Sequence, residues 1–358
     1  MLEYVAVQIF VEELFLTSDN RPRVVRLGGH LENPEREIKI VEEAGGQLIF
    51  VDARDNASIM AAIRDADIVI NAGGLRFSED VFAQLTRCRA VIQSSVGYDR
   101  IDVPSATARG IMVANLPDFC SEEVADHAVA LTLALARRLF QMQRIVREGA
   151  WSGGSYQSMA ESVDPIERLS EKTFGIIGFG NIGKLVAKKT KGIFNRLLAT
   201  DPWVKPETAA QHGVELVPLE DLLRQSDYVT LHVLLMEETR HLINADRLAL
   251  MKPTAYLVNT CRGPIVDEVA LTEALNLKKL AGAGLDVFEV EPIGPDHPLA
   301  KMDNVIVTPH LAVRSRAAMW QWRIQPIDDA ARILRGHYPR GLVNRELKQT
   351  LGLKESLE

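Results

Sequence analysis

The sequence predicts an α/β protein made of two domains, each built around a parallel sheet. The chain has 358 residues, which is long for a single hydrophobic core. Short runs rich in β-branched residues alternate with helical stretches in two separate series, and a glycine-rich turn follows the first strand of the second series. With 47% hydrophobic and 25% charged residues, the composition is typical of a soluble globular protein.

The two series differ in position and in number of strands. In the first, the predicted strands lie at residues 23–27, 47–51, 67–71, 90–94 and 111–114. The second begins at Thr173, and its six predicted strands lie at residues 174–177, 197–200, 228–232, 255–259, 282–285 and 305–308. Because helical stretches separate the strands in both series, each series is expected to form a parallel sheet.

Other segments link or follow the two series. Residues 121–147 predict one long apolar helix that crosses between the domains, with Ser121 as its N-cap and acidic residues in its first turn. Residues 151–172 are rich in Ser, Gly and Glu without a period, which indicates a surface excursion. After Pro309 the pattern predicts a helix through Leu334, and this tail must pack onto one of the two domains because it has no strand series of its own.

The charge balance and the cysteines exclude several classes of partner. The 41 basic and 48 acidic residues give a net charge of -7, without a basic cluster, so nucleic acid is not an expected partner. Cys88, Cys120 and Cys261 lack the paired spacing of a disulfide framework or a zinc site, so no metal is expected and a reducing cytoplasm fits best.

No segment is expected to enter a membrane. The apolar stretch at residues 5–16 is interrupted by Glu12 and Glu13, and it has neither a basic n-region nor a cleavage site, so it is not a signal peptide. No other run approaches the roughly 18 consecutive apolar residues of a spanning helix.

A dinucleotide site is predicted at the turn formed by Gly178, Phe179, Gly180, Asn181, Ile182 and Gly183. This GxGxxG pattern follows a buried-strand run and precedes a helical stretch at 184–194, so a pyrophosphate can lie on the N–H groups of a helix N-terminus. A side chain at Gly180 would block that approach. The next strand ends at Asp201, at the spacing of a carboxylate that accepts from the ribose hydroxyls.

Asp201 also predicts the choice of cofactor. A carboxylate repels a 2′-phosphate, and Pro202, Trp203 and Val204 supply no Arg to bind one, so NAD is expected rather than NADP. The alternative is that Asp201 only ends a strand.

Three polar residues that follow later strands predict an acid–base site: Arg262, Glu291 and His310. Ligands of open α/β sheets bind where strands end. A guanidinium can bind a carboxylate in a bidentate manner or polarise a keto oxygen, and a histidine can exchange a proton near neutral pH. A glutamate beside the imidazole would orient it and favour its protonated form. Taken singly, these residues could equally be a surface ion-pair partner, the start of a turn and a helix cap.

Several segments together resemble the D-isomer-specific 2-hydroxyacid dehydrogenase family over nearly the whole chain. Besides the glycine-rich turn, the matching segments are residues 97–102 (GYDRID), 108–111 (ARGI), 124–127 (VADH), 259–270 (NTCRGPIVDEVA), 284–292 (GLDVFEVEP) and 308–310 (TPH). The resemblance implies two Rossmann-like domains. A flavodoxin-like substrate domain would be split between residues 1–120 and 311–358, and a doubly wound NAD-binding domain would be inserted at 121–310, with a cleft between them.

The resemblance also implies roles for individual residues. Arg262 would bind substrate, His310 would act as acid and base, and Glu291 would be its partner. The substrate carboxylate would bind the backbone N–H groups around Val96 and Gly97, near Gly73. Besides the glycine-rich turn, Arg262 and His310, the implied cofactor contacts are Asp201, Pro202, His232, Val233, Thr239, Thr260, Cys261 and Asp286.

The expected reaction is reversible hydride transfer between NAD and C2 of a small 2-keto or D-2-hydroxy acid. Cys120 stands where many members of the family have Asn, which bears on substrate choice. Val96 stands where phosphite-oxidising relatives have Lys, and the loop at residues 71–75 lacks the cation of the phosphoglycerate enzymes, so neither substrate is expected.

An alternative function and an oligomeric state also follow from the pattern. The spacing from Gly149 to Thr173 resembles the C-terminal-binding-protein corepressors, which share this fold, so an NAD(H)-sensing binding protein remains an alternative. The apolar stretch at 121–147 can serve an interface as well as a core, which predicts a homodimer joined through the NAD domains.

Overall fold

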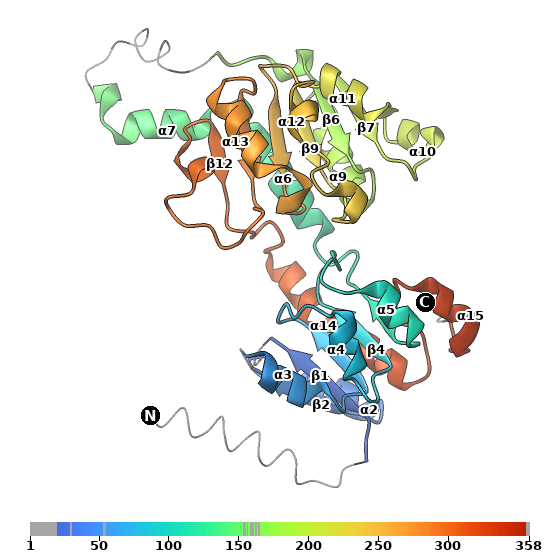
Figure 1. Cartoon of the computed structure of the whole chain (residues 1–358). Helices are drawn as coiled ribbons and strands as arrows, with labels where there is room; N and C mark the ends of the chain where they lie inside the picture. The colour runs from blue at the N-terminus through green and yellow to red at the C-terminus, as the bar shows by residue number, and fades with distance from the viewer. Residues whose placement is uncertain are drawn as a thin grey trace. The chain divides into compact units, whose positions relative to one another are not determined.

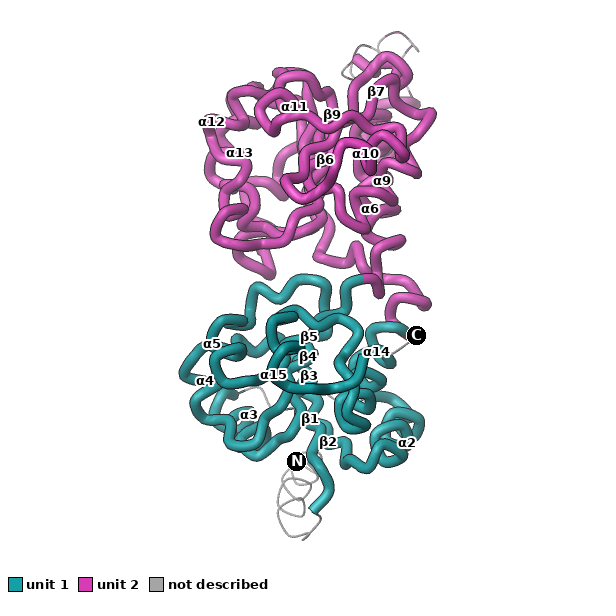
Figure 2. Tube along the Cα trace, turned by 90° about the vertical axis from the view of Figure 1, so that its right-hand side faces the viewer, with its two compact units in different colours: residues 1–117, 321–358 teal, residues 118–320 magenta. Residues whose placement is uncertain are grey.

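The computed structural model describes residues 20–28, 31–52, 55–152, 155, 157, 161, 163 and 165–355. The apolar stretch at residues 5–16 lies outside these ranges. The chain divides into two compact units, shown in different colours in Figure 2: residues 1–117 with 321–358 form unit 1, and residues 118–320 form unit 2. Each unit contains its own parallel sheet, so the predicted α/β class is confirmed.

Unit 1 has a five-stranded sheet in the order β2-β1-β3-β4-β5 (Figure 2). Its strands are β1 (Arg23–Leu27), β2 (Gln47–Val51), β3 (Ile68–Asn71), β4 (Ala90–Gln93) and β5 (Met112–Ala114). Its helices are α2 (Glu35–Glu43), α3 (Asn56–Ile63), α4 (Glu79–Ala83), α5 (Val103–Ala108), α15 (Lys348–Leu351), the 3-10 turn η6 (Arg345–Leu347) and the part of α14 (Arg316–Leu334) from Gln321 onward.

The chain end completes unit 1. Alternate strand residues such as Val24 and Ile68 pack against Ile327 of α14, while the opposite face is covered by a separate apolar cluster. Asn344 fastens the edge strand, because its side chain accepts from Val113 N at 2.8 Å and donates to Ile111 O at 2.9 Å. The C-terminal tail therefore packs onto the first sheet, as its lack of strands required.

Unit 2 has a seven-stranded sheet in the order β12-β11-β10-β9-β6-β7-β8. Its strands are β6 (Thr173–Ile177), β7 (Arg196–Thr200), β8 (Glu215–Leu216), β9 (Tyr228–Leu231), β10 (Tyr256–Asn259), β11 (Gly282–Leu285) and β12 (Val305–Val307). Its helices are α6 (Ser121–Ala136), α7 (Leu139–Arg147), α9 (Asn181–Thr190), α10 (Pro206–Gln211), α11 (Leu219–Gln225), α12 (Ala245–Leu248) and α13 (Glu268–Asn276). Its 3-10 turns are η1 (Ala150–Ser152), η2 (Leu169–Glu171), η3 (Glu237–Thr239), η4 (Gly263–Ile265) and η5 (Pro298–Lys301).

The prediction of six strands in the second sheet was wrong by one. The missed strand, β8, has two residues and pairs only with β7 at the edge of the sheet. A strand of this length has no room for the alternation or the buried run by which strands are predicted.

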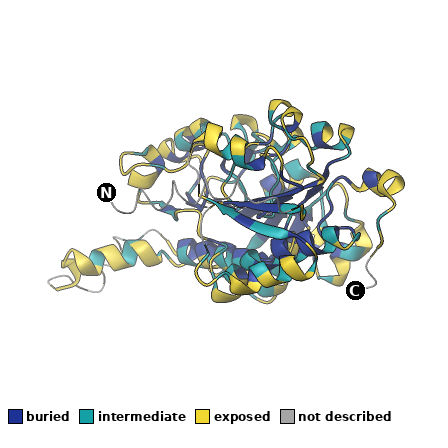
Figure 3. Ribbon diagram, turned by 90° about the horizontal axis from the view of Figure 1, so that it is seen from below, coloured by how far each residue is buried: buried dark blue, intermediate teal, exposed yellow. Residues whose placement is uncertain are grey.

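The prediction of one helix over residues 121–147 was also wrong. The helix breaks at Arg138, whose φ of 54° is left-handed, and its guanidinium lies 5.2 Å from the centre of the Tyr256 ring. Ser121 is the first residue of α6 and not its N-cap, which is Cys120. The two halves differ in burial: α6 packs on β10 and β11 through residues such as Leu131, whereas no residue of α7 is buried (Figure 3).

Among the described residues, no helix is both long and apolar enough to cross a bilayer.

Arg26 is an exception to the apolar interior of unit 1. It lies on β1 with no exposed surface, and none of its three side-chain nitrogens has a hydrogen-bond partner among the described residues. Its guanidinium lies over the Trp322 ring at 4.7 Å. Burial lowers the pKa of Arg26 to about 10, although the nearby Glu37 carboxylate acts in the opposite direction.

We predict that Arg26→Met raises the free energy of unfolding of unit 1 by about 1–3 kcal/mol, because an apolar side chain of similar length removes a buried charge without hydrogen bonds. Urea denaturation measures this change, with the exposed Arg64→Met as the control that should leave stability unaltered. A lower midpoint for Arg26→Met would show that the stacking on Trp322 outweighs the cost of burying the charge.

Candidate active site

The glycine-rich turn lies between β6 and α9 and leaves the helix N-terminus open. Gly178 has a left-handed φ of 90°, and a Cβ there would lie 2.5 Å from His232 O. A Cβ at Gly183 would overlap the carbonyl of Gly178, so both positions require glycine. A Cβ at Gly180, by contrast, would have no atom within 4 Å. The space next to Gly180 is therefore open, and the first N–H groups of α9, beginning at Asn181, lack intrahelical acceptors, as at helix ends that bind phosphate groups.

Asp201 follows β7 and is bonded to the glycine-rich turn. One carboxylate oxygen accepts from Phe179 N at 2.8 Å and the other accepts from Trp203 N at 2.8 Å. Each oxygen retains a lone pair for a ribose hydroxyl. Phe179 itself is fully buried, so the turn presents its backbone and not its ring. Pro202 lies between Asp201 and Trp203 in the sequence, and the Trp203 side chain is 87% exposed.

Two buried polar atoms without partners lie at the ends of neighbouring strands. His232 follows β9, and burial lowers the pKa of its imidazole to about 3, so the ring is neutral at physiological pH. Its Nε2 lies 3.0 Å from Thr230 Oγ1, whereas its Nδ1 has no hydrogen-bond partner among the described residues, and the same holds for Thr260 Oγ1 after β10. Such atoms are expected where a bound molecule completes a polar site.

The other implied cofactor residues lie close to these strand ends. Val233 contacts the Gly178 position through its side chain. Thr239 lies in η3, where its hydroxyl donates to Leu234 O at 2.6 Å. Cys261 follows Thr260, and burial raises the pKa of its thiol to about 11, so it is not a nucleophile at neutral pH.

Arg262 is carried by a loop that is held at both ends. Asn259 of β10 donates to Arg262 O at 2.9 Å, and an Arg262 Nη1 bond to Cys261 O, also 2.9 Å, orients the guanidinium. The next residue, Gly263, lies so close to Phe288 that a Cβ would overlap the Phe288 carbonyl. The loop of Arg262 is therefore in backbone contact with the loop that follows β11.

Asp286, after β11, holds the turn that carries His310. It has no exposed surface, and its carboxylate accepts from Thr308 Oγ1 at 2.6 Å, from Leu311 N at 3.1 Å and from Ala312 N at 2.9 Å. His310 N donates to the Asp286 carbonyl at 2.8 Å. His310 has a φ of 54°, a left-handed conformation that these bonds sustain.

His310 and Glu291 form a hydrogen-bonded pair. His310 Nδ1 lies 2.7 Å from Glu291 Oε2, and Glu291 Oε1 accepts from Phe288 N at 2.9 Å. Partial burial acts to raise the pKa of Glu291, but the bonds from His310 and Phe288 and the charge of Arg262 outweigh it and hold the pKa below its ordinary value. Glu291 is therefore ionised at neutral pH, and the structure brings the three predicted catalytic residues together in unit 2.

Apart from Arg262, the predicted substrate contacts lie in unit 1, at the ends of β3 and β4. Gly73 packs against the backbone of Gly28. The carbonyl groups of Val96 and Gly97 are held by Asn115 Nδ2 at 2.7 Å and by Ser95 Oγ at 2.6 Å, which fixes the direction of this loop.

Sequence reasoning missed the residues that support the turn of His310 by hydrogen bonds. Asp286 was expected to touch the cofactor, but its bonds to the turn of His310 were not foreseen. His127 of α6, whose Nε2 lies 3.0 Å from Thr308 Oγ1, also supports that turn. Both residues lie in motifs that carry the family resemblance, which was the available signal. In the described part of the chain, no group of three or more His, Cys, Asp or Glu residues could hold a metal ion.

We predict that Asp286→Ala lowers the free energy of unfolding by about 3 kcal/mol or more, because it leaves two backbone N–H groups and one hydroxyl without their buried acceptor. Chemical denaturation measures the change. Asp296→Ala is the control, since its ion pair with Lys301 is exposed and should contribute little. Equal stability of the two variants would contradict the role given to Asp286.

Comparison with known proteins identifies the family. A family model described as "D-isomer specific 2-hydroxyacid dehydrogenase, NAD binding domain" matches residues 129–312. A glyoxylate reductase of Korarchaeum cryptofilum is 41% identical over 318 residues, which cover 88% of this chain and 95% of the relative. A glyoxylate reductase of Pyrococcus furiosus is 39% identical over 320 residues, covering 88% and 94%.

Solved structures agree. The PH0520 protein of Pyrococcus horikoshii superposes with a TM-score of 0.82 at 30% identity, covering 93% of this chain and 98% of the other. The D-lactate dehydrogenase of Aquifex aeolicus, complexed with NAD and lactic acid, superposes with a TM-score of 0.74 at 29% identity, covering 92% and 98%. The chain therefore belongs to the D-isomer specific 2-hydroxyacid dehydrogenase family and is an NAD-dependent oxidoreductase.

Proposed function

We propose that the enzyme reduces a small 2-keto acid at C2 with NADH, that glyoxylate is one such substrate, and that in the reverse direction it oxidises a D-2-hydroxy acid. The observation that carries the proposal is the 2.7 Å pair of His310 and Glu291, close enough to Arg262 for its charge to lower the pKa of Glu291. The relatives named glyoxylate reductase support the substrate class.

In this mechanism the protein moves one proton and positions the substrate. NADH supplies the hydride that reaches C2, so that keto acid, NADH and one proton give hydroxy acid and NAD. His310 donates the proton to the carbonyl oxygen from Nε2, since Nδ1 is engaged by Glu291. Arg262 binds the substrate and stabilises charge on that oxygen as it develops. In the oxidative direction His310 takes the proton back.

Unit 1 would hold the rest of the substrate. We assign residues 1–120 and 311–358 to the substrate domain and residues 121–310 to the NAD-binding domain, with the backbone around Val96, Gly97 and Gly73 binding the substrate carboxylate. The loop at residues 71–75 has no charged side chain, and Asn71 bonds it internally through Leu75. A substrate without a phosphate group fits such a loop.

The cofactor contacts follow from the strand ends of unit 2. The first turn of α9 would bind the pyrophosphate and Asp201 the ribose hydroxyls, which favours NAD over NADP. The unpartnered atoms of His232 and Thr260 would complete this site. We place the enzyme in the cytoplasm, because Cys88, Cys120 and Cys261 are all free thiols.

A screen of small 2-keto acids with NADH tests this function. We expect turnover of glyoxylate or a similarly small acid by the parent. His310→Asn should then lower kcat/KM by about 100-fold or more, because a general acid contributes 10²–10⁴-fold, and NADH binding should be kept. Arg262→Ala should have an effect of the same order, whereas Arg224→Ala, at an exposed arginine of α11 that pairs with Asp221, should not.

Two outcomes would contradict this assignment. Parent-like turnover by His310→Asn would remove the histidine from the reaction. Tight NADH binding by the parent with negligible turnover of every acid would instead favour the alternative of an NAD(H)-sensing binding protein.

We further propose that the enzyme is a homodimer joined through the NAD domains at α7. Apolar side chains of α7 and of the turn η1 after it are exposed among the described residues: Phe140 is 56% exposed, and Leu139 and Val146 of α7 and Trp151 of η1 are also exposed. Figure 1 shows α7 extending away from the sheet of unit 2. Exposed apolar clusters of this kind are typical of interfaces.

Light scattering at micromolar concentration should give twice the mass of one chain. Phe140→Glu combined with Val146→Glu should give the mass of a monomer, because each carboxylate would be buried in the interface. Leu277→Glu, at an exposed apolar site after α13, is the matched control and should leave the dimer intact. A monomeric parent would refute the proposal.

A further inference from the structure

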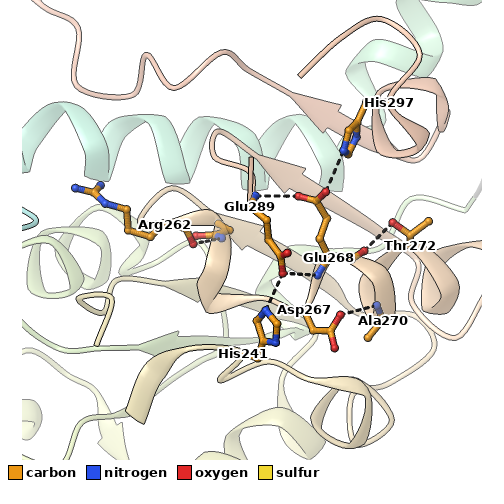
Figure 4. A network of polar contacts seen from close by, with 9 residues as sticks. His241, Arg262, Asp267, Glu268, Ala270, Thr272, Glu289 and His297 are labelled. Carbon is orange, nitrogen blue, oxygen red and sulfur yellow. Dashed lines mark hydrogen bonds and ion pairs between the residues drawn. The ribbon is translucent and has the colours of Figure 1, made fainter. Parts of the chain in front are cut away.

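Two glutamates join the loop of Arg262 to the loop of Glu291 by a reciprocal pair of hydrogen bonds. Glu268 begins α13, five residues after η4 begins, and Glu289 lies two residues before Glu291. Glu268 N donates to Glu289 Oε1 at 3.3 Å, and Glu289 N donates to Glu268 Oε2 at 3.1 Å (Figure 4). Each side chain thus accepts from the backbone of the other residue.

A histidine completes the bonding of each glutamate. His241 Nε2 lies 2.8 Å from Glu289 Oε1, and His297 Nε2 lies 3.0 Å from Glu268 Oε1. His241 is fixed in turn, because its N–H donates to the Pro264 carbonyl within η4. His297 packs edge-on against Phe288 with ring centres 5.5 Å apart. Four separate segments therefore converge on the two glutamates, which we call the Glu268–Glu289 clamp.

The clamp acts on the peptide groups next to the catalytic residues. The N–H of Phe288 donates to the Glu291 carboxylate, and the adjacent N–H of Glu289 donates to Glu268. On the other side, the backbone of Gly263 is in contact with the Phe288 carbonyl and the Glu289 nitrogen. A shift of the backbone of Phe288 and Glu289 would therefore move both the N–H that bonds Glu291 and the carbonyl against which Gly263 rests.

The clamp does not itself reach the reacting atoms. In Figure 4 the guanidinium of Arg262 points away from Glu268, Glu289 and both histidines. The side chains of Glu268 and His297 are largely buried, and those of Glu289 and His241 are partly exposed. None of the four is therefore a candidate to bind substrate from the position that it occupies.

We propose that Glu268 and Glu289 are positioning residues of the reaction: their reciprocal bonds fix the loop of Glu291, and through it His310, in register with Arg262. The proposal rests on the function assigned above to the three catalytic residues. Its physical basis is that small displacements of catalytic groups are costly, since about 1 Å can lower a rate by 10²-fold.

Two matched variants at Glu289 show whether the length of its side chain or its charge is needed for catalysis. Glu289 Oε1 alone accepts from both Glu268 N and His241 Nε2. Glu289→Gln keeps an oxygen at the same reach without the charge, and should retain kcat within about threefold. Glu289→Asp keeps the charge but withdraws the oxygen by one methylene, and should lower kcat by about 10- to 100-fold while the KM for NADH changes little. Glu273→Asp, on the exposed side of the same helix, is the control and should match the parent.

The pH profile gives a second readout. The bonds from His310 and Phe288 help to hold the pKa of Glu291 below its ordinary value. If Glu289→Asp loosens them, that pKa rises toward the ordinary value, so Glu291 becomes protonated at a higher pH as acid is added. The acid limb of kcat should therefore move to higher pH in Glu289→Asp and stay in place in Glu289→Gln.

A crystal structure of Glu289→Asp tests the proposal without turnover, so failure of the clamp is distinguishable from failure of the proposed substrate. Glu291 Oε2 should lie beyond hydrogen-bonding distance of His310 Nδ1, that is, more than about 3.5 Å away. Parent-like kcat and an unmoved Glu291 in Glu289→Asp would overturn the proposal. An equal loss of kcat in Glu289→Gln and Glu289→Asp would also overturn it, because charge and not reach would then be the cause.

Discussion

The hydrogen bonds to the buried carboxylate of Asp286 hold the turn that carries His310, and the arrangement of the proposed catalytic residues depends on them. A charge without exposed surface is tolerated only when hydrogen bonds replace its water. This carboxylate accepts from Thr308 Oγ1, Leu311 N and Ala312 N, all in the segment that carries His310. Satisfying the charge and placing His310 are therefore one event in folding. Glu291 follows five residues after Asp286, so the same loop also carries the carboxylate that bonds His310, the proposed acid–base residue.

In the glycine-rich turn, too, the residues that shape the backbone also hold a residue of the proposed cofactor site. Two of its glycines are required by the backbone that surrounds them, His232 O in one case and Gly178 O in the other. Only the middle glycine faces open space. Phe179 turns its ring into the interior and gives its N–H to Asp201, so the residue that would select the cofactor is held by the turn that would bind the phosphates.

The strands were predictable from sequence because most of them are buried on both faces and read as continuous apolar runs. β1 and β2 were predicted to the residue. The break at Arg138 was not, because it contains neither Gly nor Pro, and its guanidinium meets Tyr256, which is more than a hundred residues away in the sequence. The proximity of Arg262, Glu291 and His310 was predictable since each follows a strand, and their catalytic roles stay a prediction. The hydrogen bonds between Glu268 and Glu289 were not predictable. They join two loops that are distant in the sequence, and which loop residues meet depends on the three-dimensional fold.

The break at Arg138 divides a continuous stretch of apolar sequence into two parts under different constraints. Changes in α6 disturb a packed interior that also supports His127 and, through Thr308, the turn of His310. Changes in α7 remove no buried side chain of their own unit and should cost little folding free energy. Substitutions on the surface of α7 can therefore accumulate, and with them changes to the proposed dimer interface, while the packing of α6 and the strand ends stays fixed.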